Sequence, residues 1–179
     1  MYINSEVQGT RPLDSRAGRE EAVYDLLESL GVSCERVDHD PTASVELCEV
    51  VEKVLDIHIC KNLFLSNRQG TSFYLLLMRG RKEFRTKDLS AQLGTSRLSF
   101  GKPEFMMTYL NTKPGSASVL GLMNDVGRQV QLVIDQDVLD DEYIGCHPCE
   151  NTTSLKIRTS DLLEKILPAV KHEAILVDL

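Results

Sequence analysis

The stretch His58-Ile-Cys-Lys-Asn-Leu-Phe-Leu65 decides the fold, because it has the apolar pattern of a β-strand and one charged residue inside it. In the two-residue period of a strand, Lys61 shares a side with Ile59, Leu63 and Leu65. Burying an ammonium group is costly unless it is paired, so Lys61 is a candidate functional residue. The alternative is that the strand is locally irregular and the lysine side chain extends to water.

A second apolar run, residues 72–78, predicts a strand that other elements cover on both faces. Helices and strands are mixed without a strict βαβ rhythm, which predicts an α/β (α+β) fold with a mixed sheet. Helices are expected over 16–30 with Ser15 as cap, after a cap at Ser44, and over 86–94, 103–110 and 161–170. Further strands are expected over 32–39, 98–100, 129–134, 143–148, 154–157 and 174–177.

The length of 179 residues favours one domain, expected over 15–179, after a flexible lead-in over 1–14. No apolar run approaches the ~18 residues that span a bilayer, and the start lacks a basic-then-apolar pattern. We therefore expect a cytoplasmic protein that does not enter membranes. The five cysteines are an odd number, which favours reduced thiols over disulfide bonds.

The formal charge of −7 argues against a protein that coats nucleic acid over its whole surface. The charge is divided, however. Residues 79–102 hold seven Lys and Arg against two acidic residues, which gives +5 there and −12 elsewhere. A local phosphate-binding patch with Arg79, Arg81 and Lys82 would have this form, and a solvated surface would have it equally.

Small residues dominate the run Pro114-Gly-Ser-Ala-Ser-Val-Leu-Gly-Leu122. Glycines let a backbone approach a ligand closely and present N–H groups to it. The run lacks the phosphate-binding G-x-x-x-x-G-K-[ST] pattern, and an ordinary surface loop is the alternative.

The segment Cys146-His-Pro-Cys149 could supply two zinc thiolates, with His58 and Cys60 completing a site. That second pair lacks the usual ligand spacing, so no metal is predicted. Ser116 or Ser118 could instead pair with His147 as nucleophile and base, although neither serine lies in a nucleophile elbow.

Several segments occur in a familiar order, and together they cover roughly residues 20–178. They are the helix over 21–31, Glu35-Arg-Val-Asp-His-Asp-Pro41, Cys60-Lys-Asn-Leu-Phe-Leu65, Pro114-Gly-Ser-Ala-Ser118, Gly121-Leu-Met-Asn-Asp125, Val133-Ile-Asp135 and His147-Pro-Cys-Glu-Asn-Thr152. With these segments the chain resembles the YbaK-like aminoacyl-tRNA editing family, and most of all its stand-alone members that deacylate mischarged alanyl-tRNA(Pro).

The resemblance implies a single domain with a curved, mixed, partly closed sheet and flanking helices. It implies hydrolysis of the ester that joins a wrong amino acid, most of all alanine, to the terminal adenosine of tRNA(Pro). The reaction is expected to need no cofactor. Lys61 matches the functional lysine, and Gly115 opens the G-x-x-x-P loop, whose last position is Val119 here. The other residues implied to bind substrate are Asn62, Ser116, Ala117, Ser118, His147 and Asn151.

The implied partners are the acceptor end of tRNA(Pro) and prolyl-tRNA synthetase, with no role for DNA. Two alternatives remain open. One is a non-catalytic module of the same fold that senses or carries tRNA, which Val119 and the acidic surface favour. The other is a zinc-dependent hydrolase that uses the Cys and His set above.

Overall fold

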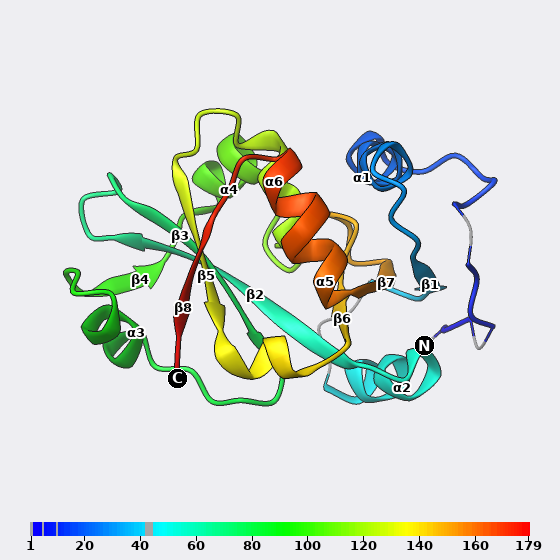
Figure 1. Cartoon of the computed structure of the whole chain (residues 1–179), viewed down its shortest axis with the longest axis horizontal. Helices are drawn as coiled ribbons and strands as arrows, with labels where there is room; N and C mark the ends of the chain where they lie inside the picture. The colour runs from blue at the N-terminus through cyan, green and yellow to red at the C-terminus, as the bar shows by residue number, and fades with distance from the viewer. Residues whose placement is uncertain (1, 5, 10, 42–44) are drawn as a thin grey trace.

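An open mixed sheet runs through the part of the chain that the computed structural model describes, which is residues 2–4, 6–9, 11–41 and 45–179 (Figure 1). The strands pair in the order β1-β7-β6-β2-β3-β5-β8, and β4 pairs with β2 beside this path. This confirms the predicted mixed sheet. The partial closure that the resemblance implies is not found, because β1 and β8 are the two ends of the sheet and do not pair with each other. The strands are β1 Glu35–Asp38, β2 His58–Asn67, β3 Phe73–Arg79, β4 Leu98–Phe100, β5 Val130–Asp135, β6 Tyr143–Cys146, β7 Thr153–Arg158 and β8 Ala174–Val177.

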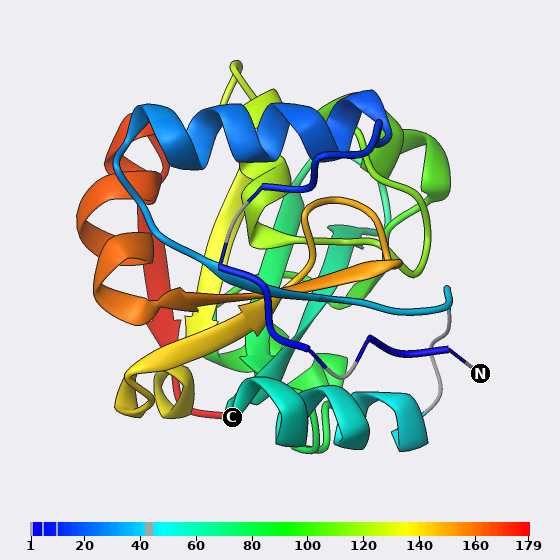
Figure 2. The same ribbon diagram turned by 90° about the vertical axis from the view of Figure 1, so that its right-hand side faces the viewer.

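Helices cover both faces of the sheet, as Figure 2 shows for α1 and α2 on opposite sides. On β3, Leu75 and Leu77 pack into one core with α1 and α4, while Leu76 and Met78 pack into another with α3. The near-continuous apolar run of β3 is explained by burial on both faces. The helices are α1 Gly18–Ser29, α2 Val45–Leu55, α3 Thr86–Gln92, α4 Pro103–Leu110, η1 Val119–Asn124, η2 Gln136–Asp140 and the consecutive α5 Thr159–Asp161, η3 Leu162–Ile166 and α6 Leu167–Ala169.

Strand β2 has one continuous neighbour and two partial ones. It pairs antiparallel with β3 from Cys60 to Ser66. On its other side, β6 pairs in parallel with His58 and Ile59, and β4 pairs antiparallel with residues 65–67. A glycine makes the β6 contact possible, because a Cβ on Gly145 would lie 3.1 Å from the Cα of Ile59. Between the two partial neighbours, the described strands leave one edge of β2 open.

Three helix predictions need comment. Ser15 was expected to cap α1, and this is wrong: Ala17 is the N-cap and makes no side-chain cap bond. Arg16, expected as the first helical residue, lies before the helix, and its guanidinium is ion-paired with Asp38 at 2.9 Å. Ser44, expected to cap α2, lies outside the described residues. The last helix contains the π-helical turn η3, which accommodates Pro168 because a proline cannot donate to the carbonyl four residues earlier.

The described residues of the lead-in contact the domain at several points. Ile3 forms a β-bridge with His39, and Gln8 forms one with Arg36. Arg11 is ion-paired with carboxylates of α1, among them Asp25 at 2.6 Å. No helix in the described part of the chain is long and apolar enough to cross a bilayer.

We expect Leu75→Ala to destabilise the fold strongly, because Leu75 is fully buried in the central strand. Leu-to-Ala changes in cores cost about 2–5 kcal/mol of unfolding free energy. Urea denaturation measures the loss. The matched control is Leu176→Ala, at a leucine that is 48% exposed on β8, where little change is expected. Similar losses in both variants would contradict the assignment of the core.

Candidate active site

Lys61 and Asn62 lie on β2 where its open edge begins. The parallel pairing of β2 with β6 ends at Ile59 and Gly145. Two residues further along each chain come Lys61 and His147, so these residues occupy corresponding positions where the two strands separate. The open edge ends at Phe64, whose carbonyl accepts a hydrogen bond from the Gly101 N–H at 2.9 Å.

Lys61 is half-buried, and its ammonium group donates a hydrogen bond to the carbonyl of Lys82. Burial lowers the pKa of Lys61, and the charge of Glu83 partly opposes this effect. The segment that carries the accepting carbonyl is itself fixed, since the Lys82 ammonium lies 2.8 Å from Asp135 and 2.7 Å from Asp137. An ammonium has three donors, so Lys61 retains two for a ligand.

Asn62 points to the opposite face of β2 from Lys61, because side chains alternate along a strand. Its neighbours on that face, Cys60 and Phe64, belong to the core that includes Val119. The Asn62 Oδ1 atom is buried and has no hydrogen-bond partner among the described residues. A buried amide oxygen without a partner is uncommon and is compatible with a role in binding a ligand.

The loop from Gly115 to Ser118 lies against the segment that follows β6. Gly115 has a φ of +86°, which side chains disfavour, and a Cβ there would lie 3.6 Å from Nδ2 of Asn151. Ser118 Oγ donates to the carbonyl of His147 at 2.6 Å and accepts from the N–H of Leu120 at 3.2 Å. Three predicted positions, Gly115, Ser118 and His147, are thus brought together with Asn151.

Ser116 and Ala117 complete this loop, Ser116 buried and Ala117 half-buried. Val119 takes the place of the expected proline and is the first residue of η1. The first position of a helix is where proline is favoured, because its N–H would have no partner inside the helix. Val119 therefore replaces the proline at a position where the helix η1 itself fixes the backbone at the end of the loop.

The ring of His147 has a defined tautomer. Its Nδ1 lies 3.0 Å from the carbonyl of Thr153, which can only accept, so the proton of a neutral ring is on Nδ1. Burial lowers the pKa of His147, with a smaller contribution in the same direction from His39. The ring is therefore neutral near pH 7, and Nε2 carries a lone pair that can accept a hydrogen bond.

His39 was not among the predicted site residues, although its ring lies beside His147, with 6.3 Å between ring centroids. It is buried, and its Nε2 lies 2.9 Å from Oγ of Ser154. The sequence feature that could have pointed to His39 is its position directly after a strand and before the Asp40-Pro41 turn. We infer that the ring of His39 packs beside that of His147.

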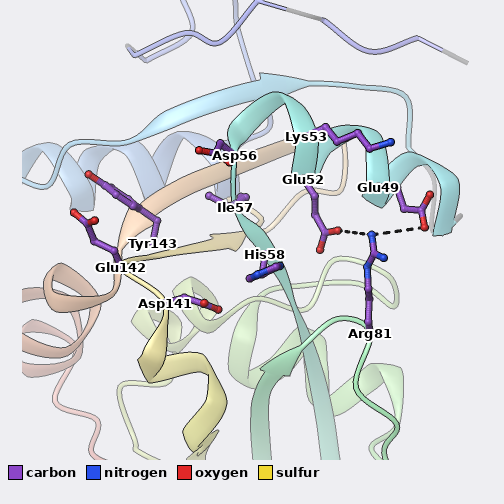
Figure 3. A pocket seen from close by; sticks show the side chains of 10 residues that line it. All are labelled: Glu49, Glu52, Lys53, Asp56, Ile57, His58, Arg81, Asp141, Glu142 and Tyr143. Carbon is purple, nitrogen blue, oxygen red and sulfur yellow. Dashed lines mark hydrogen bonds and ion pairs between the residues drawn. The ribbon is translucent and has the colours of Figure 1, made fainter.

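Carboxylates neutralise the three basic residues predicted to bind tRNA. Arg79 bonds to Asp141 at 2.9 and 3.1 Å, and Lys82 lies between Asp135 and Asp137. Arg81 bonds to Glu52 at 2.9 Å (Figure 3). The acids that are remote in the sequence thus lie against the basic segment, and tRNA binding by these three residues remains a prediction.

A hollow of about 390 Å³ lies between α2, the start of β2 and β6 (Figure 3). It is lined by Glu49, Glu52, Lys53, Asp56, Ile57, His58, Arg81, Asp141, Glu142 and Tyr143. Five of these are carboxylates, and Arg81 is already paired with two of them. This charge disfavours a phosphate there, so we do not place the substrate in this hollow.

The alternative zinc site is not supported. No group of three or more His, Cys, Asp or Glu side chains in the described part of the chain is arranged to hold a metal ion. Burial raises the pKa of Cys60 and of Cys149 to about 12, and that of Cys146 well above its ordinary value. Without a metal these thiols therefore stay protonated, which makes them poor nucleophiles.

Comparison with known proteins identifies the family. A family model described as an aminoacyl-tRNA editing domain matches residues 39–165. The prolyl-tRNA editing protein ProX of Acetoanaerobium sticklandii is 29% identical over 149 residues, which cover 83% of this chain and 90% of that protein. The prolyl-tRNA synthetase associated domain-containing protein 1 of Danio rerio is 26% identical over 170 residues, 93% of this chain and 88% of that protein.

A solved structure, described as that of a proposed trans-editing enzyme for prolyl tRNA synthetase, superposes with a TM-score of 0.66. It is 15% identical in sequence and covers 92% of this chain and 99% of that chain. At this identity the likeness shows that the fold is shared.

We expect the ring of His147 to titrate below the ordinary histidine value of about 6.5, because burial penalises the imidazolium. NMR titration of the ring protons measures this, with the His147→Gln variant identifying the signal. A midpoint at or above 6.5 would contradict the proposed neutral, Nδ1-protonated state.

Lys82→Met is expected to cost about 3 kcal/mol of unfolding free energy, because the fully buried Asp135 loses its cation and keeps only the backbone N–H of Leu179 among the described residues. Arg81→Met serves as the matched control. The side chain of Arg81 is 68% exposed, so the loss there is expected to stay below about 1 kcal/mol. Equal small losses in urea denaturation would show that Lys82 is a surface group.

Proposed function

The chain belongs to the aminoacyl-tRNA editing family, and from this premise we propose that it is a trans-editing deacylase that clears mischarged tRNA(Pro). The favoured substrate is Ala-tRNA(Pro) released by prolyl-tRNA synthetase. The named relatives, a prolyl-tRNA editing protein and a prolyl-tRNA synthetase associated domain protein, support the class of substrate.

One observation carries the proposal: the Gly115 loop is bonded to the backbone of His147 where β6 separates from β2, and Lys61 and Asn62 lie at the start of the open edge of β2, on opposite faces of the strand. A substrate that crosses the open edge of β2 could contact both sets of groups. We place the amino acid beside Asn62, Gly115 and His147, and the nucleotide beside Lys61.

The reaction needs few groups, because the ester of an aminoacyl-tRNA is already activated. A water oxygen attacks the carbonyl carbon, the bond from that carbon to the ribose oxygen breaks, and a water proton passes to the ribose oxygen. The products are the free amino acid and a tRNA with an intact terminal ribose. Placing the water and stabilising the negative charge on the carbonyl oxygen are the two tasks left to the protein.

Backbone N–H groups of the Gly115 loop are suited to the second task, since Gly115 brings the backbone close without a side chain in the way. The unpartnered Oδ1 of Asn62 can accept a hydrogen bond from the substrate amine or from the water. The lone pair on Nε2 of His147 can accept from the same amine. Lys61, a compact cation, suits a phosphate of the terminal nucleotide.

A binding site too small for proline would give the proposed preference for alanine. A synthetase separates proline from alanine mainly by apolar contacts that the smaller side chain lacks, and such contacts discriminate only modestly. A second site that admits alanine and excludes proline by size then supplies the missing selectivity. The buried Ser118 and Val119 and the half-buried ring of His147 are the groups placed to set that size.

The proposal is tested by measuring release of amino acid from Ala-tRNA(Pro), Ser-tRNA(Pro), Cys-tRNA(Pro) and correctly charged Pro-tRNA(Pro). We expect the wild type to release alanine and to leave proline in place. Lys61→Ala should lower kcat/KM by about 10- to 100-fold, mainly through KM, since a charged hydrogen bond to the nucleotide is lost. Asn62→Ala should act mainly on kcat.

The matched control is Lys165→Ala, an exposed lysine paired with Asp161 on the last helix, which should keep wild-type activity. Equal activity of the wild type and Lys61→Ala would remove Lys61 from the site. If no charged tRNA is hydrolysed but tRNA binds, the chain is a non-catalytic tRNA-binding module and the proposed activity is wrong.

A further inference from the structure

Phe100 is an exposed aromatic residue next to the candidate site. It ends β4, and 65% of it is open to solvent, whereas Leu98, on the same side of that strand, is 1% exposed. The buried core therefore ends at Leu98, and Phe100 extends beyond it. The ring of Phe84 lies 6.5 Å away, nearly perpendicular, and supports Phe100 from one side.

The position of β4 connects this ring to the site. Phe100 pairs with Leu65 of β2, and paired residues of an antiparallel ladder share a face. Lys61 is on the same face of β2, four residues earlier, which is about 13 Å along a strand. β4 also borders the open edge of β2, because Gly101, directly after Phe100, bonds to Phe64 (Figure 1).

The charge around Phe100 differs from that around Arg79, Arg81 and Lys82. Arg97 and Lys102 flank β4, both are exposed, and neither forms a salt bridge with a described residue. The acidic residue nearest to Phe100 in the sequence is Glu104. Of the basic segment over 79–102, Arg97 and Lys102 are thus better placed to bind a phosphate than the three paired residues.

We propose that Phe100, Arg97 and Lys102 bind the unpaired 3′ nucleotides of the tRNA acceptor end. The ring would stack on a base, and the two cations would contact the backbone on either side. An exposed aromatic between unpaired cations is how proteins bind single-stranded nucleic acid, since every base has a face to stack. The proposal rests on the proposed function, and it assigns the tRNA contact to β4.

Two measurements test it. In the first, steady-state deacylation of Ala-tRNA(Pro) by Phe100→Ala should show KM raised about tenfold, within the range that base stacking contributes, with kcat little changed. Phe100→Trp should keep a KM near that of the wild type, and Phe100→Leu should behave like Phe100→Ala. The matched control is Val126→Ala, an apolar residue 89% exposed elsewhere, which should leave KM unchanged.

The second measurement does not depend on catalysis. Fluorescence anisotropy compares binding of an uncharged acceptor-stem hairpin with and without its unpaired 3′ nucleotides. The wild type should prefer the hairpin that has them, and Phe100→Ala should lose that preference. A double variant, Arg97→Ala with Lys102→Ala, should weaken binding and flatten its dependence on salt.

The proposal would be overturned if Phe100→Ala kept the KM and the hairpin binding of the wild type. The exposed ring would then be a contact for a protein partner. A KM near that of the wild type in Phe100→Leu would also overturn it, because an apolar contact without an aromatic ring would then suffice. If the wild type hydrolyses no charged tRNA but prefers the unpaired end through Phe100, the proposed activity fails while this inference stands.

Discussion

The structure depends on the divided pairing of β2. One edge of this strand is bonded to β3 along most of its length, while the other is shared between β6 and β4. β6 runs parallel to β2 and β4 runs antiparallel, and each covers one end. A strand edge without a partner is a cost that proteins usually avoid, because its backbone groups are left to water. Here the open part coincides with Lys61, Asn62 and the point where β6 separates toward His147, so the interruption in pairing forms the candidate site.

The two faces of β2 carry different groups of the candidate site. Side-chain alternation sends Lys61 to one face and Asn62 to the other, although they are neighbours in the chain. The ammonium of Lys61 is supported by the carbonyl of Lys82, which the buried Asp135 fixes through the Lys82 side chain. His147 is supported by Thr153, whose hydroxyl bonds to Asp38 at 2.9 Å and to Glu20 at 3.2 Å. Lys61 and His147 thus each have a partner that fixes the orientation of the side chain.

The charge distribution shows how folding changes the meaning of a sequence pattern. The segment over 79–102 carries +5, yet Arg79, Arg81 and Lys82 are paired with carboxylates from α2, β5 and the chain that follows β5. These pairs join residues that are about 30 to 60 positions apart in the sequence, so no local pattern could reveal them. Among the cations for which the described residues supply no such pair, Arg97 and Lys102 flank the strand that carries the exposed ring of Phe100. The acidic total is therefore compatible with a small contact surface for the end of a tRNA.

The sequence by itself determined the elements, the mixed sheet and the family, because hydrophobic periodicity and ordered motifs are local properties. It also singled out Lys61, Gly115, His147 and Asn151 as residues in unusual contexts. Only the tertiary structure decided which of them lie together, which lysines and arginines are paired, that the ring of His39 lies beside that of His147, and where β2 is open. The physical reason is that pairing between strands and between charges depends on contacts across the chain, and those contacts exist only once the strands have found their neighbours.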